Sequence, residues 1–114
     1  MDTFKNKSLK NRKLEYNKIK SKYPNKIPII VNISKNSKNI ILNKNKYLCE
    51  KDTNLSILIN IIRKNINIDK SNALFFTINN NLYNSQVSIG EIYKSNKNED
   101  GFLYIECACE NTFG

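Results

Sequence analysis

The chain opens with charged residues among which apolar side chains recur at helical spacing. This apolar stripe consists of Leu9, Tyr16 and Ile19. Such spacing predicts a helix within residues 3–22. Ser8 is a suitable N-cap for it, and Phe4 before the cap indicates a separate short helix. The helix is expected to end at Tyr23, because a residue that precedes proline disfavours the α conformation.

Two short apolar runs after the helix predict a pair of antiparallel strands. The first run, residues 29–31, is β-branched and follows Pro28, and the second is residues 47–49. Residues 34–45 between them are interpreted as a turn and loop. Their apolar members are Ile40, Ile41 and Leu42.

The second half of the chain alternates helical and strand patterns. Its most apolar helix is predicted over residues 55–66. The expected buried face consists of Leu55, Leu58, Ile59, Ile62 and Ile66. A strand over residues 73–78 is followed by an Asn-rich turn at residues 79–81. A short helix near residues 90–93 and a last strand over residues 102–109 complete the chain.

This order of elements predicts an α+β fold. Two hairpin-linked strands, a helix and two further strands form the β-grasp order, to which the N-terminal helices are an addition. A chain of 114 residues without repeats or linkers is expected to form one domain. We divide it into a helical extension over residues 1–22, a core over residues 23–109 and a tail over residues 110–114.

The charge of the chain is concentrated in its first half. The net charge is +9, and residues 1–50 carry thirteen Lys or Arg against three acidic residues. A basic half can face the phosphates of nucleic acid or of an anionic membrane. However, Lys, Asn and Ile are frequent along the whole chain, as A/T-rich coding would produce, so we attribute most of the charge to composition. No helix-turn-helix, zinc or RNA-recognition signature appears, so nucleic-acid binding is the less favoured alternative.

The residue inventory disfavours an enzyme. The chain has no histidine, which excludes Ser–His and Cys–His nucleophilic pairs, and its three glycines are isolated. Glu99 and Asp100 are adjacent in an expected turn and are interpreted as solvated. Cys49, Cys107 and Cys109 lack a histidine partner for zinc and are interpreted as small buried hydrophobic residues. No cofactor or metal is expected.

Neither end of the chain carries a recognisable membrane or export signal. No apolar run reaches the roughly 18 residues of a transmembrane helix, and the N-terminus lacks a signal-peptide pattern. We therefore expect a protein made soluble inside the cell. The last residue, Gly114, has no Cβ, so its carboxylate can enter a narrow channel in another enzyme. A terminal glycine is common, so alone this is a weak signal.

Several blocks of sequence, taken in order, resemble the autophagy ubiquitin-like modifiers of the GABARAP type. These blocks are Glu15 with Ile19, residues 22–31, residues 44–48, residues 62–64, residues 73–76, Asn79 with Asn80, and residues 99–105. The resemblance covers nearly the whole chain. It implies a ubiquitin-like β-grasp fold over residues 23–109 that carries two additional N-terminal helices.

The first function that this resemblance implies is conjugation to a lipid. Gly114 would be joined to phosphatidylethanolamine, with Phe113 beside it in a flexible conjugation tail. The implied partners are an ATP-dependent activating enzyme, a conjugating enzyme and a deconjugating cysteine protease. Because the chain ends on its glycine, we expect no cleavage before activation. The implied location is the cytoplasm and the autophagosome membrane or, in an apicomplexan-type lineage, a plastid (apicoplast) membrane.

The second implied function is the capture of short Trp/Phe/Tyr-x-x-Leu/Ile/Val motifs in adaptor or receptor proteins. Such a peptide adds a strand beside the second predicted strand. The resemblance maps the pocket for the aromatic anchor to Glu15, Ile19, Pro28, Ile30, Lys46, Leu48 and Phe102. It maps the pocket for the aliphatic anchor to Tyr47, Cys49, Leu58, Ile61 and Ile62. Lys26 and Lys44, together with Lys46, are expected to attract acidic residues that flank the peptide core.

Three residues depart from the family pattern near the aliphatic pocket. Glu50 stands where a proline is usual, Thr53 where an aliphatic residue is common, and Asn65 where a basic residue often helps to hold the peptide. The specificity of that pocket therefore stays open.

Two alternatives to a lipid-conjugated modifier also stay open: a peptide-binding module that is not conjugated and, with less support, a nucleic-acid-binding protein. On pattern alone, Ile30, Leu48 and Leu58 are interpreted as core. Only the resemblance makes them pocket walls.

Overall fold

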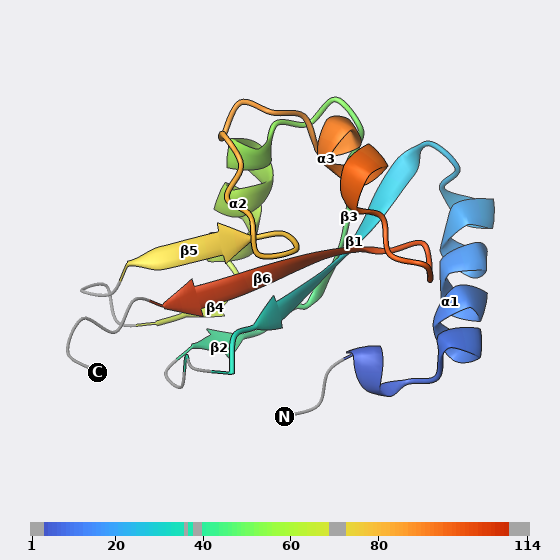
Figure 1. The fold of residues 1–114 in the computed structure, drawn as a ribbon, viewed down its shortest axis with the longest axis horizontal. Coiled ribbons are helices and arrows are strands. Elements are labelled where there is room, and N and C mark those ends of the chain that lie inside the picture. The colour runs from blue at the N-terminus through green and yellow to red at the C-terminus, as the bar shows by residue number, and fades with distance from the viewer. Residues whose placement is uncertain (1–3, 36, 38–39, 69–72, 110–114) are drawn as a thin grey trace.

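The computed structural model describes residues 4–35, 37, 40–68 and 73–109 of the chain. Its elements in chain order are η1 (Phe4–Asn6), α1 (Leu9–Lys22), β1 (Lys26–Ile33), β2 (Ile41–Leu42), β3 (Lys46–Glu50), α2 (Leu55–Arg63), β4 (Ile66–Asn67), β5 (Leu74–Thr77), α3 (Ile89–Asn96) and β6 (Leu103–Cys109). Figure 1 shows α2 and α3 together on one side of the main sheet and α1 on the other.

The main sheet has four strands in the order β3-β1-β6-β5. β1 lies parallel to β6 and antiparallel to β3, while β5 lies antiparallel to β6. The first and last long strands of the chain are therefore neighbours at the centre, and β3 and β5 are the edges. This arrangement confirms the predicted β-grasp order and the α+β fold class.

β1 is the central strand and is buried on both faces. Ile27, Ile29 and Val31 belong to the main core that α2 and α3 cover, whereas Ile30 packs in a second cluster beneath α1. A strand covered on both faces needs a continuous apolar run, which the sequence supplies. Pro28 is tolerated because β6 pairs with β1 only from Ile29 onward.

The N-terminal helices form as predicted, although the first is a single 3-10 turn. The Ser8 hydroxyl accepts a hydrogen bond from the Asn11 amide at 3.1 Å, and α1 ends where Tyr23 precedes Pro24. No residue of α1 is fully buried, because the helix lies on the sheet along one side only. Phe4 of the 3-10 turn is buried and fixes the start of the segment.

The prediction was wrong at the end of the long helix. α2 stops at Arg63, and Ile66 lies in β4, where it pairs with Leu42 of β2. The segment interpreted as loop therefore contributes β2 to a separate two-stranded sheet. Strands of two residues are too short to show a period of two, so the pattern extended the helix instead.

The remaining elements agree with expectation. Asn79 and Asn80 take positive φ angles of 51° and 67° in the predicted Asn-rich turn after β5. Cys49 and Cys107 are buried as predicted, while Cys109 is only half-buried. Burial is the main cause that raises the pKa of the Cys49 and Cys107 thiols to about 11, so both act as small hydrophobic groups.

Candidate functional site

β3 combines an unpaired edge with alternating side chains. Tyr47 and Cys49 point into the main core, whereas Lys46, Leu48 and Glu50 are exposed. β1 pairs with one side of β3, and no strand in the described part of the chain pairs with the other. Such an edge presents backbone groups to which an extended peptide can hydrogen-bond.

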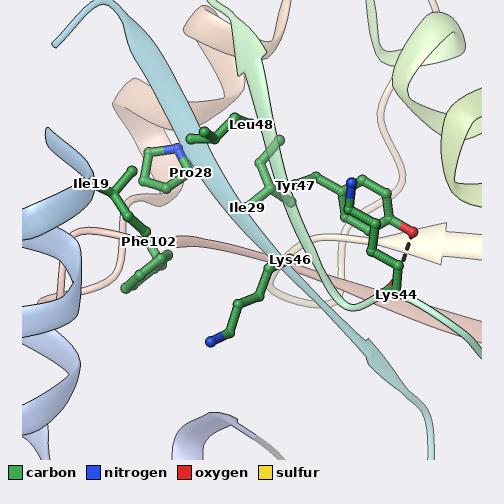
Figure 2. Close-up of a pocket in the computed structure, with 8 residues that line it drawn as sticks. All are labelled: Ile19, Pro28, Ile29, Lys44, Lys46, Tyr47, Leu48 and Phe102. Atoms are coloured by element: carbon green, nitrogen blue, oxygen red, sulfur yellow. Dashed lines mark hydrogen bonds between the residues drawn. The ribbon is translucent and has the colours of Figure 1, made fainter. Parts of the chain in front are cut away.

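A hollow of about 300 Å³ lies beside this strand, between α1, β1 and β3 (Figure 2). Its lining residues are Ile19, Pro28, Ile29, Lys44, Lys46, Tyr47, Leu48 and Phe102. Leu48 is 39% exposed, which makes it a wall of the hollow and not core. Apolar side chains from three elements therefore face an open space of a size that an aromatic side chain can enter.

Aromatic packing holds α1 against the sheet at the hollow. The Phe102 ring centroid lies 4.9 Å from that of Phe4 and 5.8 Å from that of Tyr16, both edge-on. Ile30 belongs to the same buried cluster. The floor of the hollow is thus closed by packed side chains.

Charged groups stand at the rim of the hollow. Glu15 on α1 accepts from the Lys46 ammonium at 2.6 Å and from Lys7 at 3.1 Å, so it ties the helix to β3. Desolvation alone would raise the pKa of Glu15, but the hydrogen bonds from Lys46 and Lys7 outweigh it and lower that pKa. The Tyr47 hydroxyl donates to the Lys44 carbonyl at 2.7 Å, which fixes the chain just before β3 (Figure 2).

The structure brings together the residues proposed for the aromatic-anchor pocket. Five of them line the hollow: Ile19, Pro28, Lys46, Leu48 and Phe102. Ile30 is buried beneath it, and Glu15 reaches its rim through Lys46. Ile29, which sequence reasoning did not assign to this pocket, also borders the hollow, although it is fully buried in the main core.

The residues proposed for the aliphatic-anchor pocket are mostly packed. Tyr47, Cys49, Leu58 and Ile62 are members of the main core. Ile61 is 42% exposed on the outer surface of α2. In this structure the second pocket is therefore a closed patch of core with one exposed aliphatic side chain at its margin.

The lysines proposed to meet acidic flanks are not all in one place. Lys44 lines the hollow with Lys46. Lys26 stands opposite Glu50 in the β1–β3 register, whereas Lys46 stands opposite Ile30. Lys26 is therefore at the far end of β3 from Lys44.

A buried ion pair that the sequence did not reveal anchors α1 to the turn before β6. Asp100 is 1% exposed, which corrects its interpretation as a solvated turn residue. Its carboxylate accepts from Arg12 at 2.6 Å, from the Phe102 amide at 2.8 Å and from the Tyr104 hydroxyl. The partners Arg12 and Asp100 are 88 positions apart, so no local pattern signals the contact.

Among the described residues, no three His, Cys, Asp or Glu side chains gather in a group that could hold a metal ion. No helix there is long and apolar enough to cross a membrane. Phe113 and Gly114, proposed for conjugation, lie outside the described residues.

The comparison that decides the family is a match of residues 11–114 to the family model described as autophagy protein Atg8 ubiquitin like. The chain belongs to the Atg8 family. Autophagy-related protein 8c of Arabidopsis thaliana is 37% identical over 106 residues, covering 93% of this chain and 89% of that protein. Autophagy-related protein 8B of Oryza sativa subsp. japonica is 36% identical over 107 residues, covering 94% and 90%.

Solved structures of Atg8 proteins have the same fold. The crystal structure of Trypanosoma brucei ATG8 has a TM-score of 0.85 at 28% identity and covers 100% of both chains. Plasmodium falciparum Atg8, solved in complex with a Plasmodium falciparum Atg3 peptide, has a TM-score of 0.82 at 25% identity, covering 96% of this chain and 100% of that one. The expected ubiquitin-like β-grasp fold and the autophagy ubiquitin-like family are thereby confirmed.

Proposed function

We propose that this Atg8-family chain is a ubiquitin-like modifier that is conjugated through Gly114 to phosphatidylethanolamine and captures short motifs of adaptor or receptor proteins. The observation that carries the peptide-capture part of the proposal is the apolar hollow of about 300 Å³ directly beside the unpaired edge of β3. The chain acts in binding and not in catalysis, and it needs no cofactor.

The proposed ligand is a peptide of the form Trp/Phe/Tyr-x-x-Leu/Ile/Val. Its backbone pairs with β3 while its aromatic side chain enters the hollow against Leu48 and Phe102. Its aliphatic side chain packs beside Ile61, on the core patch at the other end of β3. Lys44 and Lys46 at the rim favour acidic residues before the aromatic anchor.

The proposed conjugation uses the tail that follows β6. The family match extends to Gly114, five residues after β6 ends at Cys109. The proposed partners are an activating enzyme, a conjugating enzyme and a deconjugating cysteine protease. The relative from Plasmodium falciparum was solved with an Atg3 peptide, which supports contact with a conjugating enzyme. Phosphatidylethanolamine supplies two acyl chains, enough for stable anchoring where one chain is marginal.

Intact-mass measurement of the chain from cells tests the conjugation. Under conditions that induce autophagy, we expect an added phosphatidylethanolamine mass that is absent in Gly114→Ala. A Phe113→Ala variant, which keeps the terminal glycine, is the matched comparison and should retain some adduct. Only unmodified protein under these conditions would contradict the proposal. Imaging of the lipidated form then distinguishes autophagosomes from a plastid membrane.

Peptide titration tests the second part independently. We expect Leu48→Ala and Lys46→Ala to weaken binding of an acidic-flanked Trp-x-x-Leu peptide, with or without Gly114. Leu82→Ala is the control, because Leu82 is 70% exposed and does not line the hollow. Affinity that is unchanged in both hollow variants would remove the peptide site. Binding without any lipid adduct would favour a module that is not conjugated.

A further inference from the structure

The exposed face of β3 carries opposite charges at its two ends. Lys46, Leu48 and Glu50 follow one another on this face, and Lys44 precedes the strand. Lys46 and Glu50 are four residues apart. A strand rises about 3.3 Å per residue, so the two charges are separated by about 13 Å along β3. Any peptide that pairs with this edge is exposed to cations at one end and an anion at the other.

Glu50 forms no ion pair within the described part of the chain. Its cross-strand neighbour is Lys26, whose ammonium lies 5.9 Å from the centre of the Tyr23 ring. Burial is the largest cause that raises the pKa of the Cys49 thiol, and the negative charge of Glu50 is the second. The positive charge of Lys26 lowers that pKa. The field of Glu50 therefore reaches the side of β3 where the aliphatic anchor is proposed to pack.

The spacing of the two anchors decides which peptide residue meets Glu50. An aromatic anchor at the hollow lies beside Lys46, and the aliphatic anchor follows three residues later. A peptide that runs parallel to β3 at the same rise per residue then places its aliphatic anchor beside Cys49. The residue directly after that anchor comes beside Glu50.

We propose that Glu50 selects peptides that carry Lys or Arg directly after the aliphatic anchor, in addition to an acidic residue before the aromatic one. The inference rests on the proposed peptide site and names its ligand as a peptide with an acidic N-terminal and a basic C-terminal flank. Lys26 reduces the effect but does not cancel it, because β1 lies on the side of β3 away from the peptide, one strand spacing further off.

Three fluorescent peptides test the selectivity. They share the core Asp-Trp-Ala-Ala-Leu and differ only in the next residue, which is Lys, Gln or Glu. We expect the Lys peptide to bind about two- to five-fold more tightly than the Glu peptide, the range of an exposed charge pair. The difference should shrink as salt is added, since salt screens exposed charges.

Variants of the chain assign the effect to Glu50. Glu50→Gln should equalise the three affinities, Glu50→Lys should reverse their order, and Lys26→Gln should widen the original difference. Glu106→Gln is the matched control, because Glu106 is an exposed glutamate on β6, another strand of the same sheet, and should leave the preference unchanged.

The outcomes separate the inference from the function on which it rests. Tight binding of all three peptides with equal affinity, or a preference that persists in Glu50→Gln, would overturn the inference alone. Failure of every peptide to bind would overturn the proposed peptide site and the inference with it.

Discussion

Asp100 is the one charged residue that is buried in the described part of the chain. Its buried carboxylate holds Arg12 of α1, the Tyr104 hydroxyl and the Phe102 amide at the same time. Burial and the hydrogen bond to Asp100 raise the pKa of Tyr104, so the phenol stays protonated as a donor. The hydrogen bond to Asp100 likewise raises the pKa of Arg12.

Replacement of Asp100 by Asn should be strongly destabilising. The substitution leaves the Arg12 guanidinium without its counter-charge, and Arg12 is only 12% exposed. Removal of one partner from a buried pair costs about 3 kcal/mol in the free energy of unfolding. Urea denaturation measures the loss. Glu99→Gln changes the neighbouring exposed carboxylate and should stay within about 0.5 kcal/mol of the parent; an equal loss in both variants would contradict this role of Asp100.

Gly101 is required by both conformation and space. Its φ is +99°, and a Cβ there would lie 2.5 Å from the Tyr16 ring. We expect Gly101→Ala to lower the free energy of unfolding by about 2 kcal/mol, measured by thermal or urea denaturation. Against a Tyr16→Ala background the added loss should be smaller, since only the backbone strain remains. An equal loss in both backgrounds would show that the ring contact does not matter.

At the scale of elements, the contact between α1 and β3 shapes the hollow. Glu15 shares its carboxylate between Lys7 and Lys46, so part of the charge of Lys46 is neutralised before any peptide arrives. The pKa of Glu15 is lowered from 4.5. Its contribution to stability is therefore present above the ordinary glutamate range and is lost as the pH falls through the lowered value.

Glu15→Gln should have opposite effects on stability and on binding. We expect a loss of about 0.5 kcal/mol in the free energy of unfolding at pH 7, because the pairs are partly exposed, and a much smaller difference from the parent at pH 3. Denaturation at the two pH values measures this. Affinity for an acidic-flanked peptide should rise at pH 7, since Lys46 is released; an affinity that falls would mean that Glu15 itself contacts the peptide.

At the scale of the whole molecule, the N-terminal segment and the sheet are joined by a second core and an ion pair. Phe4, Ile30 and Phe102 form a cluster between the N-terminal segment and the sheet. The Arg12–Asp100 pair adds a second link. Besides Phe4, the α1 residues Tyr16 and Ile19 pack against this cluster, so the N-terminal segment contributes to a core that it shares with the sheet.

Deletion of residues 1–22 should destabilise the chain severely. The deletion uncovers Ile30 and Phe102 and leaves Asp100 buried without Arg12. The full chain is expected to unfold in one transition that is the same by circular dichroism and by tyrosine fluorescence. The deleted chain should melt at a lower temperature and bind a hydrophobic dye. Equal melting temperatures would make the N-terminal segment an independent appendage.

Local signals account for the elements that were predicted correctly. Ser8 and Tyr23-Pro24 define α1 because capping and proline sterics act within a few residues. The apolar run in β1 required burial on both faces, and Asn79 and Asn80 permitted their left-handed turn. The aromatic-anchor residues came from the family resemblance and not from spacing, since Leu48 and Leu58 look alike in sequence.

The sequence by itself determined the helices and the longer strands, their order and the family, because helix caps, strand patterns and long similar blocks are properties of neighbouring residues. Only the tertiary structure decided that Leu48 is a wall while Leu58 is core, that Asp100 is buried, and that β2 pairs with β4. Each of these depends on contacts between residues far apart in the chain. The strand order places Lys26 beside Glu50 and away from Lys44, so it also decided the charge pattern along β3.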